Sequence, residues 1–431
     1  MIVYMKMLFI WCLLVFPLSQ FDIAAQAPLS KTVKKNLSGL EEFHRRGGLD
    51  HVFYQTDTSR FVRIAYLGGS ITEAAGGWRE LTFSWFRLTY PQTIFVQVNA
   101  GIGGTGSDLG AFRVEDEVLK QGPDLLFVEF AVNDASRSRE DVIRSMEGIV
   151  RKVRKNNPYT DICFVYTVTE AQCDLLLEGK LHSTVMAMEE LAGHYGIPSI
   201  HMGICVARLL AEGKLLFTAP QSKNATSIVF TQDKVHPLPE SGHPLYAAAV
   251  TKYLGKMKQG KKPVPYSLPA PLMDDNWQDA RMVAVDDVDK QGNWVKITAD
   301  DPVFKGFLPR LPGIYMGSAG SKLKFRFKGT TLGLYDVIGP GTGALRITID
   351  GTGHTVQRFD RYCTYWRLAN TIVLDKLDNT EHDVEIEVLH PGLDKKKILT
   401  DANLEKYQKN QAAYKDENFY IGRLLLVGNL L

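Results

Sequence analysis

Hydrophobic residues follow two different patterns on either side of a proline-rich stretch near residue 260. From about residue 60 to 258, short apolar runs alternate with longer segments whose apolar residues recur at helical spacing. The runs are RIAYLG, TIFVQV, DLLFVEF, ICFVYTV and PSIHMG, and they are rich in Val, Ile and Phe. Near-continuous apolar strands joined by helices predict a parallel sheet covered on both faces. We therefore expect residues 60–258 to form a doubly wound α/β domain.

The second half of the chain alternates apolar and polar residues instead, and Gly, Asp and Asn separate its segments. These segments are KLKFRFKGTTLGLYDV, GALRITIDG, HTVQRF, NTIVLDKL and HDVEIEVL. The pattern predicts an antiparallel, jelly-roll-like β-sandwich over residues 293–431. Residues 259–292 are proline-rich and lack either period, so we expect an extended linker there. The charged stretch at 392–418 predicts a solvated loop or short helix.

The first 27 residues are typical of a signal peptide. Lys6 precedes an apolar stretch, and a small-residue AAQA follows it. The apolar stretch, residues 7–18, is shorter than the ~20 residues that a membrane span needs. We expect export to the periplasm, cell surface or exterior, with residues 28–59 as a lead-in and no stable membrane insertion after cleavage. An uncleaved anchor is the alternative.

Charge and cysteine content exclude several classes of protein. The chain has 50 Lys and Arg against 48 Asp and Glu, which gives no reason to expect a nucleic-acid partner. Cys163, Cys173, Cys205 and Cys363 follow the signal at wide, irregular spacing, unlike a metal site or a dense disulfide framework. We expect buried free thiols, although export would permit one bridge. No cofactor or metal is expected.

Ser70 ends the first apolar run, in RIAYLGGSITEAAGGW. Two glycines before it let the backbone turn sharply. Taken alone, this pattern fits a serine that caps a helix. A serine nucleophile would also need a general base and an acid that orients the base.

His236 could be that base and Asp233 the acid that orients it, and both lie in TQDKVHPLPESGHPLYA. They lie three residues apart, so on a single helical turn their side chains would share a face. The carboxylate could then fix the imidazole tautomer while the other ring nitrogen faces Ser70. The alternative is a structural role, in which Asp233 caps the next helix beside a surface histidine.

Two further strand ends offer donors for an oxyanion. NAGIGGTGSD follows the second strand and presents glycine N–H groups, and VEFAVNDAS follows the third and presents the Asn133 amide. Each stretch alone also fits an ordinary turn. In a doubly wound sheet, however, the carboxyl ends of successive strands converge in space. We therefore expect these groups to gather around Ser70.

The four stretches in this order resemble the SGNH (GDSL-like) hydrolase family over about residues 60–258. The resemblance implies a flavodoxin-like fold, with Ser70 as nucleophile and Asp233 and His236 completing the catalytic triad. It also implies an oxyanion hole from Ser70, Gly104 and Asn133, with Gly103 one place from the family position. Gly69 departs from the family, which has aspartate there. Glycine at that position is familiar among carbohydrate-active members.

Other catalytic arrangements fit the sequence less well. An α/β-hydrolase elbow needs Gly-x-Ser-x-Gly, but Thr72 stands two residues after Ser70. His243 lies on the helix after the Asp-x-x-His turn. His182, His194 and His201 have no such acid nearby, so we expect surface or packing roles for these histidines.

Substrate and domain roles follow from the architecture. No long apolar lid separates the four stretches, so an open site for a small acyl group on a large substrate is expected. Export and a β-sandwich favour a carbohydrate O-acetylesterase over a lipid or thioester acylhydrolase or a non-catalytic glycan-binding protein. Aromatic residues in 362–368 could stack on sugar, but more often such residues are sandwich core.

A chain ending near residue 262 should then still cleave a small ester while losing activity on polymeric glycan. In the alternative, the sandwich covers an apolar face of the α/β domain, and such a chain would aggregate.

Overall fold

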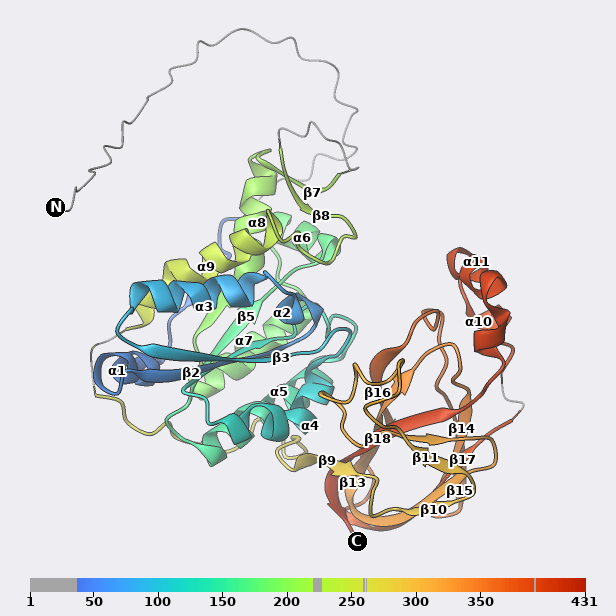
Figure 1. The fold of residues 1–431 in the computed structure, drawn as a ribbon. Helices are drawn as coiled ribbons and strands as arrows, with labels where there is room; N and C mark the ends of the chain where they lie inside the picture. Colours follow the sequence, from blue (N-terminus) through green and yellow to red (C-terminus); the bar gives the residue numbers. More distant parts are fainter. Residues whose placement is uncertain (1–36, 220–226, 259, 261, 391–392) are drawn as a thin grey trace, which may run out of the picture. The chain divides into compact units, whose positions relative to one another are not determined.

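The order of elements along the chain changes near residue 280, from alternating strands and helices to a series of strands that short helices interrupt only near residues 395–414 (Figure 1). The structure is a computed structural model that describes residues 37–219, 227–258, 260, 262–390 and 393–431. The predicted signal peptide and the start of the lead-in lie outside these residues. The described residues all belong to one compact unit, Lys35–Leu431. No helix among them is long and apolar enough to cross a membrane.

A six-stranded sheet forms the centre of the first domain, in the order β1-β6-β5-β4-β2-β3. Its five principal strands are parallel, in the order that flavodoxin-like folds use, and β1 pairs antiparallel with β6 at the edge. The predicted α/β fold is confirmed, although the lead-in contributes a helix and a strand to it. The strands are β1 (Phe43–His44), β2 (Phe61–Gly68), β3 (Ile94–Gly101), β4 (Leu125–Glu129), β5 (Asp161–Tyr166) and β6 (Ser199–His201).

Helices cover both faces of this sheet, and Figure 1 shows α3 and α9 on the side opposite α4 and α5. A short parallel pair, β7 and β8, precedes the Asp-x-x-His turn. The elements are α1 (Asp50–Thr58), α2 (Ser70–Glu73), α3 (Trp78–Thr89), α4 (Ser107–Glu117), η1 (Leu119–Gln121), α5 (Arg139–Asn156), α6 (Glu170–Leu177), α7 (Ser183–Tyr195), α8 (Met202–Ala211), β7 (Leu215–Thr218), β8 (Ile228–Thr231) and α9 (Gly242–Met257).

The second domain is an antiparallel sheet of ten strands, which confirms the predicted sandwich class. Its central strand, β13, pairs with β17 along its first half and with β16 along its second half, while β18 borders it on the other side. The elements are β9 (Ala280–Ala284), β10 (Asp289–Gln291), β11 (Trp294–Lys296), β12 (Tyr315–Gly317), β13 (Lys322–Ile338), β14 (Ala344–Ile349), β15 (Thr352–Gln357), β16 (Arg367–Leu374), β17 (Thr380–Val388), α10 (Lys395–Ile398), α11 (Asp401–Lys409), η2 (Gln411–Tyr414) and β18 (Phe419–Leu430).

The predicted linker is shorter than 259–292. Strands β9 and β10 lie inside that range and pair with β18 and β13, so the sandwich sheet begins at Ala280. Before it, the proline-rich segment lies against the α/β domain. The Tyr266 hydroxyl donates to Asp161 Oδ1 at 2.5 Å, and the Arg154 guanidinium lies 4.1 Å from the centre of the Tyr266 ring. Proline content indicated extended backbone here but gave no sign of these contacts.

One cluster of buried side chains is shared by the two domains. It contains Phe112 of α4 and Ile149 of α5 together with Tyr335 and Val337 of β13. Trp277 belongs to the same cluster and is 2% exposed, with its ring centre 5.2 Å from that of Phe112. This shared core favours the alternative in which the sandwich covers an apolar face of the α/β domain.

The four cysteines among the described residues are free thiols, and Cys163, Cys173 and Cys363 are buried. Burial raises the pKa of Cys173 to about 12, which keeps its thiol protonated at neutral pH. The expected buried thiols are therefore present, with Cys205 only partly exposed.

Replacing Trp277 should test the shared core. Trp277→Ala removes a buried ring and leaves a cavity against Phe112, so we expect the free energy of unfolding to fall by about 3–5 kcal/mol. Urea denaturation followed by circular dichroism measures this loss. Val264→Ala is the matched control, because Val264 lies in the same segment but is 75% exposed, and its effect should stay within about 0.5 kcal/mol. Equal effects of the two substitutions would mean that the domains do not share a core.

Candidate active site

Three loops meet at the carboxyl edge of the parallel sheet. Strand β2 lies between β3 and β4, so the chain direction of the connections reverses beside it. This is the position where doubly wound folds bind their ligands. Ser70 follows β2, Gly103 and Gly104 follow β3, and Asn133 follows β4. The expected convergence of these loops is present.

Ser70 is the first residue of the one-turn helix α2. Its backbone N–H therefore belongs to the first turn, where N–H groups have no intrahelical acceptor. Gly68 allows the tight turn, since a Cβ there would lie 2.4 Å from the Thr72 hydroxyl. The Ser70 hydroxyl oxygen lies 2.8 Å from His236 Nε2. Ser70 is thus placed for proton transfer to an imidazole and does not cap the helix with its side chain.

Asp233 completes a hydrogen-bonded chain with Ser70 and His236. Its Oδ2 lies 2.6 Å from His236 Nδ1. Its other oxygen accepts hydrogen bonds from the backbone N–H groups of Val235, at 3.0 Å, and His236, at 2.7 Å. The side chains of Asp233 and His236 are 55% and 50% exposed, so the chain lies open to solvent, as expected for a site without a lid.

The expected helical turn at Asp233–His236 is wrong. Residues 232–236 form a bend, and Lys234 has a φ of +70°, in the left-handed region. The Asp233 carboxylate organises this bend by accepting the two backbone N–H groups, which short acidic side chains do in turns. The carboxylate and the imidazole meet for that reason and not because of helical spacing.

The charge of Asp233 is strongly favoured. Partial burial opposes ionisation, but hydrogen bonds from His236, from the Val235 backbone and from Thr231 outweigh it. Together they hold the pKa of Asp233 well below its usual range. Thr231 Oγ1 donates to Asp233 Oδ1 at 3.0 Å, a contact that the sequence pattern did not reveal.

The loop after β3 presents two different glycines. Gly103 donates its N–H to Glu73 Oε2 at 2.8 Å. Gly104 is exposed, has a φ of +73°, and has open space where a Cβ would lie. The N–H of Gly103 is therefore engaged within the protein. This difference fits the assignment of the oxyanion position to Gly104.

Asn133 lies directly against Gly69. A Cβ on residue 69 would lie 2.8 Å from Asn133 Nδ2 and closer still to Asn133 Oδ1. Glycine at this position therefore leaves room for the amide beside Ser70. The departure of Gly69 from the family pattern has this steric consequence, which the sequence alone could not show.

Two buried carboxylates next to the loop that carries Asn133 accept hydrogen bonds from neighbouring segments. Glu129, at the end of β4, accepts hydrogen bonds from Thr72, at 3.0 Å, and Thr167, at 2.5 Å. Burial raises the pKa of Glu129 to about 6. Asp134 accepts the Ser107 N–H at 3.0 Å, and burial raises its pKa to about 7. Sequence analysis missed both groups, although each lies within four residues of Asn133.

The four other histidines weighed as candidate bases have structural positions. His243 Nδ1 accepts the Trp78 N–H at 3.1 Å at the start of α3, and burial lowers the pKa of His243 to about 4. His182 caps α7 by accepting the Thr184 N–H at 3.2 Å. His201 is buried, and His194 Nε2 lies 2.9 Å from the Ala270 carbonyl oxygen. The expected packing and surface roles fit these contacts.

The aromatic residues at 362–368 divide between core and surface. Trp366 packs against Phe304 and Tyr420, with ring centres 4.8 and 5.1 Å away. Tyr362 and Tyr365 are 48% and 56% exposed. The core interpretation holds for Trp366 alone.

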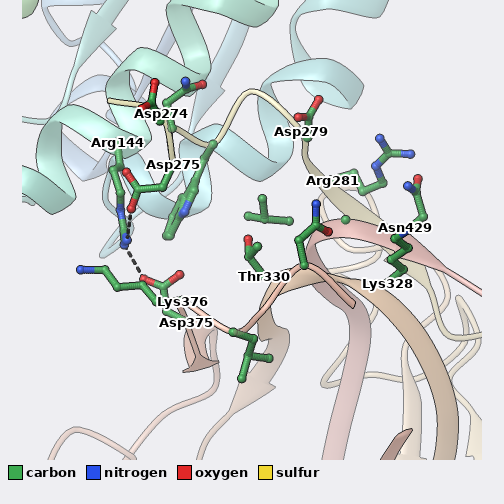
Figure 2. Close-up of a pocket in the computed structure, with 16 residues that line it drawn as sticks. Arg144, Asp274, Asp275, Asp279, Arg281, Lys328, Thr330, Asp375, Lys376 and Asn429 are labelled. Carbon is green, nitrogen blue, oxygen red and sulfur yellow. Dashed lines mark hydrogen bonds and ion pairs between the residues drawn. The ribbon is translucent and has the colours of Figure 1, made fainter. Parts of the chain in front are cut away.

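A cavity of about 740 Å³ lies away from the candidate site, and Figure 2 shows the residues that line it. Arg144 of α5 lines this cavity and contacts Asp275 and Asp375. The Arg144 Nη1–Asp275 Oδ2 distance is 3.1 Å. The cavity lining includes four cations and four carboxylates, and none of Ser70, Asp233 or His236. These ion pairs connect α5 to the segment before β9 and to the loop after β16.

Comparisons with known proteins give a family match for the α/β domain and similar folds for the chain. Residues 66–240 match the model of the GDSL-like lipase/acylhydrolase family. A solved structure of a two-domain esterase active on acetylated mannans, co-crystallised with mannopentaose, is 23% identical, with a TM-score of 0.67 over 88% of this chain and 95% of that one. Another structure of such an esterase is 21% identical, with a TM-score of 0.68 over 89% and 98%.

Both solved structures have the same fold as this chain over its two domains. A search of curated proteins found no match. The family match begins within β2, extends past the Asp-x-x-His turn and includes Ser70, Gly104, Asn133, Asp233 and His236. Over residues 66–240, the α/β domain therefore matches the GDSL-like lipase/acylhydrolase family.

Proposed function

We propose that this protein is a carbohydrate O-acetylesterase in which Ser70 is the nucleophile, His236 the general base and Asp233 the residue that orients His236. The observation that carries the proposal is the continuous chain from Ser70 Oγ to His236 Nε2, at 2.8 Å, and from His236 Nδ1 to Asp233 Oδ2, at 2.6 Å. Both distances are those at which a proton is shared between a nucleophile and its base.

Acylation begins with neutral His236. Its Nδ1–H donates to Asp233, which leaves Nε2 as an acceptor for the Ser70 hydroxyl proton. As that proton moves to Nε2, Ser70 Oγ bonds to the acetyl carbonyl carbon and the carbonyl oxygen becomes an oxyanion. Collapse of this intermediate breaks the bond to the sugar oxygen, which takes the proton from Nε2. Acetyl-Ser70 and a free sugar hydroxyl result.

Deacylation repeats these steps with water. His236 Nε2 takes a proton from water while the water oxygen attacks the acetyl carbon, and the proton then passes to Ser70 Oγ as acetate leaves. In both steps the backbone N–H groups of Ser70 and Gly104 and the Asn133 amide donate to the oxyanion. The contact of Asn133 with Gly69 supports this role, because it keeps the amide next to the Ser70 backbone.

An acetylated glycan is the substrate class that the surroundings favour. The exposed triad suits a small acyl group carried on a large, hydrated alcohol. The two-domain esterase with the same fold is active on acetylated mannans, which favours a polysaccharide here as well. Because residues 1–27 are typical of a signal peptide, we place this activity outside the cytoplasm.

Acyl preference distinguishes this function from the alternatives. Turnover should be highest on acetyl esters and should fall with longer chains, whereas a lipid or thioester acylhydrolase would gain activity with chain length. Acetate release from a panel of acetylated mannan, xylan and pectin then identifies the polymer. A protein that binds these glycans and hydrolyses none of them would be a binding module.

Replacing the nucleophile should nearly abolish hydrolysis. Ser70→Ala removes the attacking oxygen without opening a cavity, so we expect kcat on 4-nitrophenyl acetate to fall by about 10⁴-fold or more with an unchanged melting temperature. Ser59→Ala, an exposed serine at the end of α1, should retain full activity. Substantial turnover by a folded Ser70→Ala variant would eliminate the serine mechanism.

The acid side of the pH profile should report His236. Because the pKa of Asp233 is lowered, its carboxylate stays ionised on acidification, and loss of kcat/KM then reflects protonation of the imidazole. Asp233→Asn should lower kcat by roughly 10²–10⁴-fold. It should also move the acid limb to lower pH, because the imidazolium loses the negative charge that stabilises it. An acid limb that Asp233→Asn leaves in place would identify another base.

Asn133 should act on the transition state. Asn133→Ala removes one oxyanion donor, so we expect kcat to fall by roughly 10²-fold with little change in KM. Asn410→Ala, in an exposed position after α11, is the control and should have no effect. A change in KM alone would instead make Asn133 a substrate-binding residue.

A further inference from the structure

Glu73 places a carboxylate beside the nucleophile. It lies three residues after Ser70 in α2, so the two side chains share one face of that single turn. A Cβ on Gly103 would lie 3.0 Å from Glu73 Oε2 and 3.6 Å from Ser70 Cβ. The carboxylate and the Ser70 side chain therefore border the same point in the loop after β3.

The charge of Glu73 is only partly compensated. Its Oε2 accepts the Gly103 N–H at 2.8 Å, and no ion pair to Glu73 occurs among the described residues. Three cations in the segments that carry the site have carboxylate partners of their own, although Arg79 Nη2 also lies 3.4 Å from the Glu73 backbone carbonyl oxygen. These pairs are Arg79 with Glu80, Arg137 with Asp108, and Lys234 with Glu170. The side chain of Glu73 is also exposed, so its field extends into the space above Ser70.

The sugar is the part of the substrate that meets this field. An acetyl group ends one bond beyond the carbonyl carbon, so an acetyl group bound at Ser70 does not extend over the exposed Glu73 side chain. The alcohol portion is much larger and must cover the exposed surface around Ser70. A negative charge on that sugar would face the Glu73 carboxylate, and like charges repel each other more strongly the closer they lie.

We propose that Glu73 is a specificity residue that selects acetyl esters of neutral sugars and rejects those of uronic acids. The inference rests on the proposed function at Ser70, and it narrows the substrate class to glycans without a carboxylate beside the acetylated ring. In the same arrangement, Glu73 Oε2 holds the Gly103 peptide and so positions the loop that carries Gly104.

Glu73→Gln separates these two roles. The glutamine carbonyl can still accept the Gly103 N–H, so the loop keeps its anchor while the negative charge is lost. Acetylated methyl glucuronoside and its methyl ester are the probe pair, because they differ at one carboxyl group. We expect the wild type to favour the neutral ester, and Glu73→Gln to raise the ratio of kcat/KM on the anionic substrate to kcat/KM on the neutral one roughly ten-fold.

Salt supplies an independent readout. Between ~0.01 and ~1 M ionic strength the screening length falls from about 30 to 3 Å, so the wild-type preference should weaken as salt is added. The preference of Glu73→Gln should not depend on salt. Glu73→Ala should relax the preference in the same way but lower kcat on both substrates, because Gly103 loses its acceptor.

Glu115→Gln is the matched control. It removes the same charge from an exposed position on α4, and the ratio between the two substrates should not change. If the wild type and Glu73→Gln discriminate equally, Glu73 only anchors the loop and the inference is wrong. Failure of the proposed function looks different, since hydrolysis of the neutral ester would then be absent or would survive Ser70→Ala.

Discussion

The hydrogen bond between Ser70 and His236 joins two residues that are 166 positions apart in the chain, and the α/β domain is organised so that it can form. Ser70 follows the strand at which the sheet order reverses, and His236 reaches it from a bend just before α9. The bend is held by the Asp233 carboxylate, which also accepts from the imidazole. One side chain therefore fixes both the path of the backbone and the orientation of the ring.

Strand and helix periodicity predicted the parallel sheet and the sandwich well, because both depend on which face of each element is apolar. The residues of the candidate site were also predictable, since each follows an apolar strand or belongs to a short polar motif. Their convergence required only that carboxyl ends of parallel strands meet at one edge. Fold and candidate site could thus be predicted wherever local pattern and topology act together.

What could not be predicted depends on contacts between segments far apart in the chain. The left-handed Lys234 shows no sequence signal, because lysine has no preference for that region. The contacts of Trp277 and Tyr266 arise where the proline-rich segment packs on α5, and nothing in that segment's composition indicates a partner. For the same reason the two domains are less separable than their different sequence patterns suggested.

The close approach of Gly69 and Asn133 has a consequence for how this site can change over evolutionary time. Any side chain at position 69 would occupy space that the Asn133 amide now fills. An aspartate at position 69 would therefore be harmful unless the loop after β4 moved first. The two positions are coupled for this reason, so the effects of substituting both should not be additive.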